Sequence, residues 1–150
     1  MSIEKTIEAF KDHIGSFLDE PIFIGWPIDD KKGIHIFVYS VIDAPDARLS
    51  FIDHDIYPQE ICALIFANPE YEYSVIDNVL HALHRHPIFE VEDTQSAIWR
   101  DSIPAQDIAQ IFVARNQPYR LSLAYKFRSL VSKATLQELQ ENRPLNPIPA

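Results

Sequence analysis

The sequence predicts a single α/β (α+β) domain with a mixed β-sheet flanked by helices. Two observations support this class. Apolar stripes with helical spacing interleave with strand-like runs along the chain, and no internal repeat is present. The length of 150 residues, with 47% hydrophobic and 23% charged residues, is typical of one globular domain. We expect the domain to span residues 1–142 and a proline-rich arm to span 143–150.

The N-terminal segment, residues 2–18, is predicted to be an amphipathic helix. Its apolar residues are spaced by four and three positions and therefore form one stripe; they are Ile3, Ile7, Phe10, Ile14 and Phe17. Ser2 is a plausible N-cap. The helix should end at Glu20, because a residue that precedes a proline disfavours helical geometry.

Three strands are expected next, at residues 21–26, 34–42 and 61–67. The second and third are apolar on both faces, which indicates that both faces of the sheet are covered there. We expect residues 61–67 to form the central strand. Residues 43–58 contain several aspartates and prolines, and we predict a surface loop over this stretch.

A second helix is predicted at residues 73–84, with an apolar stripe at the helical period that comprises Val75, Ile76, Val79, Leu80 and Leu83. An extended segment, Ile88 to Val91, should follow Pro87, and a polar stretch should run to Asp101. We expect Ser102 to cap a third helix, with Pro104 in its first turn.

The segment from Pro118 to Val131 has the cleanest strand pattern in the sequence. Apolar residues alternate with polar or basic ones, including Arg120, Lys126 and Arg128. Such alternation predicts one buried face and one basic face, as in an antiparallel or edge strand. A last short helix is expected at residues 134–141.

Composition excludes several classes of function. The formal net charge of −9 argues against non-specific nucleic-acid binding and against an anionic membrane surface as partner. Three glycines are too few to build a glycine-rich phosphate loop. The single cysteine, Cys62, excludes a disulfide framework and lies in an apolar run, so we expect a structural role. The N-terminus does not resemble a signal peptide, and no apolar run could span a bilayer. We therefore expect synthesis in the cytoplasm.

Histidines are the main candidates for chemistry. His81, His84 and His86 have a spacing that could hold a metal ion as a three-histidine site. The simpler interpretation is that they are cations favoured at a helix C-terminus. Asp53, His54 and Asp55 could join a metal or acid–base site, but the sequence shows no second half for it. We expect no cofactor and no catalytic residue.

The strand ICALIFAN, the helix end LHALHRHPIF, the segment PAQDIAQIF and the strand QPYRLSLAYKFRSLV together resemble a known family. They are similar to the cap or tail-terminator proteins of contractile injection systems, the phage-tail-like particles. The matching residues are Leu83, His84, His86, Pro87, Pro118, Tyr119, Arg120, Leu121, Ser122 and Tyr125, and the resemblance covers about residues 34–131. Many family members continue further, whereas this sequence reaches a proline-rich end, so the resemblance does not extend to control of particle length.

The resemblance implies a structural protein and not an enzyme. Members form a ring, expected here to be a hexamer, on the last layer of inner tube and sheath, where they stop polymerisation and stabilise the extended sheath. The implied partners are further copies of the chain, the sheath and the tube, in an assembled particle. We expect contacts from the loop between Asp43 and Asp55, and from Arg120, Lys126, Arg128, Arg143, Pro144, Leu145 and Pro147. A metal-dependent enzyme and a transient assembly adaptor or chaperone are the alternatives.

Overall fold

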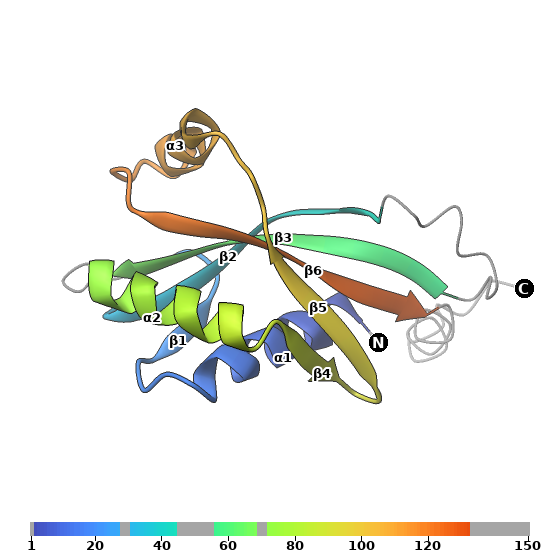
Figure 1. Cartoon of the computed structure of the whole chain (residues 1–150). Coiled ribbons are helices and arrows are strands. Elements are labelled where there is room, and N and C mark those ends of the chain that lie inside the picture. The colour runs from blue at the N-terminus through green and yellow to red at the C-terminus, as the bar shows by residue number, and fades with distance from the viewer. Residues whose placement is uncertain (1, 28–30, 45–55, 69–71, 133–150) are drawn as a thin grey trace, which may run out of the picture.

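The computed structural model describes residues 2–27, 31–44, 56–68 and 72–132. In this part the elements are α1 (Ile3–Gly15), β1 (Ile22–Ile24), β2 (Gly33–Asp43), β3 (Ile56–Asn68), α2 (Glu72–Arg85), β4 (Ile88–Val91), β5 (Thr94–Arg100), α3 (Ala105–Ala114) and β6 (Ser122–Ser132). The strands form one sheet in the order β1-β2-β3-β6-β5-β4. Helices α1 and α2 lie on one face, and α3 lies on the other (Figure 1). No helix in the described ranges is long and apolar enough to cross a membrane.

The predicted mixed sheet flanked by helices is confirmed. Strands β1 and β2 are parallel, whereas the other neighbouring pairs are antiparallel. The parallel pair depends on Gly33, whose φ is +154°. A Cβ atom at this position would lie 2.4 Å from the carbonyl oxygen of Pro21. Glycine therefore permits the close approach that lets the amide of Ile34 donate to the same oxygen at 2.8 Å.

Helix α1 begins as predicted but ends earlier. The hydroxyl of Ser2 accepts a hydrogen bond of 3.1 Å from the amide of Lys5. The stripe buries Phe10 and Ile14 completely. Phe17 was expected on the same stripe but follows the helix end, and its side chain is 41% exposed.

The hairpin of β2 and β3 is longer than predicted. Residues 61–68 are all buried and lie between two neighbouring strands, which confirms the expected interior strand. The predicted loop at 43–58 was too wide, because β2 reaches Asp43 and β3 starts at Ile56. Pro58 lies inside β3, paired with Leu130, and its carbonyl still accepts from the amide of Ala44 at 3.1 Å. A proline is tolerated where the ladder needs only its carbonyl. Residues 45–55 lie outside the described residues.

Helix α2 and strand β4 agree with the prediction, but the polar stretch that was expected to follow them is strand β5. Its sequence, TQSAIWR, has only one strongly apolar pair, and Ser96 is nevertheless buried. The hydroxyl of Ser96 donates to the carbonyl of Arg128 at 2.7 Å and accepts from the amide of Arg128 at 3.1 Å. Because its hydrogen bonds are satisfied, a polar residue can occupy a core position there.

The last strand and the third helix also differ in detail from the prediction. Strand β6 lies between β3 and β5, so it is antiparallel but not an edge strand. It begins at Ser122, which leaves Tyr119 and Leu121 outside the strand and exposed. The predicted cap Ser102 was wrong, because the N-cap of α3 is Pro104 with no side-chain hydrogen bond. The predicted helix at 134–141 falls outside the described part of the chain.

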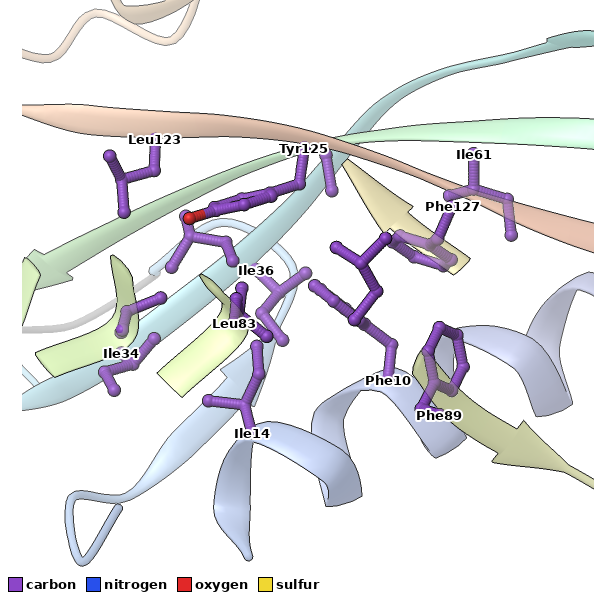
Figure 2. Close-up of a cluster of buried hydrophobic side chains, with 14 of the residues drawn as sticks. Phe10, Ile14, Ile34, Ile36, Ile61, Leu83, Phe89, Leu123, Tyr125 and Phe127 are labelled. Carbon is purple, nitrogen blue, oxygen red and sulfur yellow. The ribbon is translucent and has the colours of Figure 1, made fainter. Parts of the chain in front are cut away.

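Each face of the sheet has its own apolar cluster. The larger cluster fills the space between the sheet and the helices α1 and α2. Figure 2 shows Phe10 of α1 beside Phe127 of β6, with Phe89 of β4 close by; the rings of Phe10 and Phe127 stack with centroids 4.2 Å apart. The smaller cluster joins α3 to the opposite face through Phe112, Phe66 and Leu64. Both faces are therefore covered, as predicted from the apolar strands.

Candidate functional site

The predicted basic face of β6 lies on the side of the sheet that carries α3, and its lysine is paired within the chain. The Nζ atom of Lys126 lies 3.5 Å from Oδ1 of Asp101 and 3.9 Å from Oε2 of Glu60. The Lys126 side chain is only 25% exposed and that of Glu60 is 5% exposed. Strand pairing places Lys126 opposite Cys62 and Arg128 opposite Glu60. Lys126 of this row therefore belongs to a partly buried ion network that connects β3, β6 and the end of β5.

Arg120 has a similar internal contact near the start of β6. Its guanidinium donates to the side-chain oxygen of Asn68, and the amide of that asparagine donates to the carbonyl of Lys31 at 2.8 Å. This chain of hydrogen bonds connects the ends of three segments that are distant in sequence. Arg120 therefore also fixes the local fold around the ends of β3 and β6.

Tyr39 and Cys62 adjoin the ion network. The hydroxyl of Tyr39 donates to Oδ2 of Asp101 at 2.6 Å. Burial, followed by the contact with Asp101, raises the pKa of Tyr39 well above its usual range. Burial, with the negative charge of Asp101, also raises the pKa of the Cys62 thiol. A nucleophilic cysteine needs a lowered pKa and access to solvent, so Cys62 is structural, as predicted.

The histidines His81, His84 and His86 are exposed at the end of α2 and beyond it. The His86 ring stacks on Phe17 with centroids 4.1 Å apart, and the His86 carbonyl lies 2.8 Å from Nε2 of His13. His81 and His86 line a shallow groove of about 630 Å³ together with Asp19, Glu20 and Arg85. Within the described residues, no group of three or more His, Cys, Asp or Glu side chains is placed to hold a metal ion.

Several predicted contact residues cannot be placed. Asp53, His54 and Asp55, and the arm residues Arg143, Pro144, Leu145 and Pro147, lie outside the described residues. Of the predicted contact loop, Asp43 is the last residue of β2, and its Oδ1 accepts from Nε2 of Gln59 at 2.8 Å.

Sequence reasoning missed the carboxylates that neutralise Lys126. Glu60 lies between the predicted loop at 43–58 and the predicted strand at 61–67 and was assigned to neither, although its alternation with Cys62 and Leu64 would have placed it on the same face as those residues. No sequence pattern indicated the position of Asp101, because strand β5, which ends one residue before it, was not predicted. Only the register of β5 and β3 against β6 brings the three charges together.

No family model matches the chain, and no curated protein matches it. Solved structures, however, show the same fold in terminator caps of contractile injection systems. One is the PVC sheath/tube terminator of an extracellular contractile injection system in the extended state. It is similar with a TM-score of 0.70 and 17% identity over 88% of this chain and 57% of that chain.

A second similar structure is the tube-terminating cap of the anti-feeding prophage. Its TM-score is 0.68 at 13% identity, over 88% of this chain and 55% of that one. The chain thus spans little more than half the length of either cap. The fold is that of these terminators, which confirms the predicted tail-terminator-like α+β architecture.

Proposed function

We propose that the chain is a structural cap of a contractile, phage-tail-like injection particle. It forms a ring, most simply a hexamer, on the last layer of tube and sheath. There it stops polymerisation and stabilises the extended sheath. The observation that carries the proposal is the shared fold with two terminator caps over 88% of the chain. In this proposal the chain is made in the cytoplasm and becomes part of the assembled particle.

A ring suits this task for a geometric reason. Head-to-tail contacts between copies either run on as an open helix or close into a ring. A cap must offer one surface to the end of the polymer and no equivalent surface for the next layer. When the lateral contacts close, each copy is held by two neighbours, and no copy in the ring keeps a free lateral surface to which a further copy could add.

The distribution of charge supports head-to-tail contacts. Residues 2–20 and 73–93, which contain α1, most of α2, and β4, carry nine Asp or Glu and three Lys or Arg. The remaining described residues carry five Asp or Glu and seven Lys or Arg. Opposite potentials on two parts of one protein steer copies toward a head-to-tail contact and disfavour like-to-like contacts.

Within this proposal, the contacts come from three groups of residues. The first is the basic row Arg120, Lys126 and Arg128, of which Lys126 also serves the internal network. The second is the loop that follows Asp43. The third is the arm with Arg143, Pro144, Leu145 and Pro147, which can engage a neighbour without changing the domain.

The same proposal assigns no catalytic role to the chain. The two similar structures are a sheath/tube terminator and a tube-terminating cap. Tyr39 is half-buried and Cys62 is buried beside the ion network, and the pKa values of both groups are raised. A raised thiol pKa lowers the fraction of the nucleophilic thiolate, and the Asp101 carboxylate already accepts from Tyr39.

Imaging of particles tests the proposed function. Particles are purified from cells that produce the full particle with and without this chain, and are examined by negative-stain electron microscopy. Without the chain we expect absent, overlong or contracted sheaths. Restoring the wild-type chain should restore extended sheaths of normal form. Normal extended particles in the deletion strain would refute the proposal.

Two variants of the full chain sharpen this test. Deleting residues 143–150 should leave the domain folded but impair assembly. Reversing charge on α1 with Glu8→Lys and Asp12→Lys should weaken ring formation, because both side chains are exposed. A matched control, Gln106→Lys on the exposed side of α3, adds positive charge outside the acidic part and should have little effect. Analytical ultracentrifugation at low and high salt measures the oligomers.

A further inference from the structure

A small cavity of about 220 Å³ lies beside the edge strand β1. Aromatic and proline side chains form much of its lining: Phe23, Trp26 and Pro27, with Lys31 and His35. Trp26 follows β1 and packs its ring against Phe66 and Phe112, each with centroids 5.1 Å away. One wall of the cavity is thus a fixed aromatic surface.

Two buried polar atoms of these lining residues have no hydrogen-bond partner among the described residues: Nε1 of Trp26 and Nδ1 of His35. His35 is 2% exposed and lies between the rings of Phe23 and Phe66, at 5.2 and 5.7 Å. Burial lowers the pKa of His35 below its ordinary value, which favours the neutral ring at neutral pH. Its Nε2 lies 3.4 Å from the Lys31 carbonyl and therefore carries the hydrogen, which leaves Nδ1 as an acceptor.

The pair consists of one donor and one acceptor, which is what a peptide backbone complements. Leaving such groups unsatisfied costs roughly 1–3 kcal/mol each. Aromatic grooves with an indole N–H recognise proline-rich segments, because polyproline II geometry exposes backbone carbonyls as acceptors. The chain contains such a segment, with a P-x-x-P spacing in Pro144-Leu145-Asn146-Pro147. Leu145 and Asn146 also retain their N–H groups, which can donate to His35.

We propose that this cavity binds the proline-rich segment 143–150 of a second copy of the chain. In this contact the Trp26 indole donates to a backbone carbonyl of the segment, and the prolines pack on Phe23 and Trp26. The inference rests on the proposed ring, because it supplies one contact between neighbouring copies. It assigns a binding site to the edge of the sheet at β1, where Arg120 is the member of the basic row that lies near His35.

The geometry of the chain favours a second copy over the same copy. His35, Phe66 and Ser122 lie in one row across the sheet, whereas β6 ends at Ser132. Ten residues of strand separate Ser122 from Ser132, or roughly 33 Å, and β1 lies three strands to the side, or roughly 14 Å. Residues 133–143 span at most about 36–40 Å when fully extended. To bring its own proline-rich segment to the cavity, a chain would have to run residues 133–143 along a nearly straight line through its own domain. The segment of a neighbouring copy has no such limit on its reach.

The experiment uses the two tryptophans, Trp26 and Trp99, as ¹⁹F probes. An acceptor chain carries 5-fluorotryptophan together with Pro144→Ala and Pro147→Ala, so its own segment cannot dock. An unlabelled donor carries Trp26→Phe, which keeps an aromatic ring against Phe66 but removes the indole N–H. A second donor carries Trp26→Phe with Pro144→Ala and Pro147→Ala. All chains are full length, and circular dichroism checks folding.

The first donor should shift the ¹⁹F signal of Trp26 in the acceptor and leave that of Trp99 in place. The second donor should bind at least tenfold more weakly by the same signal. If Trp26→Phe unfolds, unlabelled wild-type chain replaces the donor. No shift, or equal shifts with both donors, would overturn the inference and leave water as the partner of the indole. Because neither sheath nor tube is present, that failure would leave capping intact, whereas normal particles in a deletion strain would remove capping itself.

Discussion

The two faces of the sheet are stabilised in different ways. Under α1 and α2, one continuous apolar cluster joins both helices to the four strands β2, β3, β5 and β6 and to the edge strand β4. On the opposite face, α3 covers only one end with a small aromatic cluster (Figure 1). Further along that face lie Tyr39, Glu60, Asp101 and Lys126, joined by hydrogen bonds and ion pairs. The larger apolar cluster on the first face stabilises the fold, whereas the second face carries polar and charged side chains that pair with one another.

This difference has a physical origin. Apolar burial is non-directional and scales with the area removed from water, so a large cluster tolerates small shifts. An ion network requires register, because each buried charge needs its partner at the right distance. We therefore expect the second face to contribute more to specificity of the fold than to its total stability.

The largest expected effect is on the first face. Phe127→Ala should lower the free energy of unfolding by about 3–5 kcal/mol, because the fully buried ring contacts Phe10 and Phe89. Urea unfolding followed by circular dichroism measures the loss. Phe127→Leu is the matched control and should lose less. Equal stability of the alanine variant and wild type would contradict the importance of this cluster.

A smaller global effect is expected on the second face. Phe112→Ala should lower the free energy of unfolding by less than about 3 kcal/mol, because α3 can detach while the sheet and first cluster persist. Hydrogen exchange should quicken in α3 and remain slow in β3. If exchange quickened equally in both elements, the two faces would unfold as one unit.

The ion network provides a third test. Lys126→Met should cost about 1–2 kcal/mol, because it leaves the buried carboxylate of Glu60 without this cation. The double variant Lys126→Met with Glu60→Gln should recover much of the loss, as measured by thermal unfolding at neutral pH. If both variants were equally destabilised, packing of the lysine stem would explain the effect instead.

The smallest expected effect is a dependence on pH at the edge of the second face. Burial, with the positive charges of Arg120 and Lys31, holds the pKa of His35 below 6.5. The unfolded chain therefore binds this proton more readily, and stability should fall as pH drops below about 6.5. His35→Phe keeps a ring between Phe23 and Phe66 and should show a smaller fall between pH 7 and 5. An identical fall in both proteins would assign the dependence to other groups.

Much of the architecture was predictable from local pattern. The stripes of α1 and α2 and the apolar run of β3 have strong periodicity, and their burial follows from it. Strand β5 was missed because Ser96 looks polar in sequence, and only its hydrogen bonds with Arg128 make it a core residue. The edges of the hairpin were missed because Pro58 signals a loop when its partner strands are unknown.

The candidate contacts show the same division. The sequence by itself determined the class of fold, the buried cysteine and the existence of a basic row on one strand. These properties depend on the order of residues along one element. Only the tertiary structure decided that the row is internally paired with Glu60 and Asp101 and that Trp26 and His35 line one cavity with unsatisfied atoms. The physical reason is that pairing and burial of charges depend on distances between elements, and the register of neighbouring strands sets those distances.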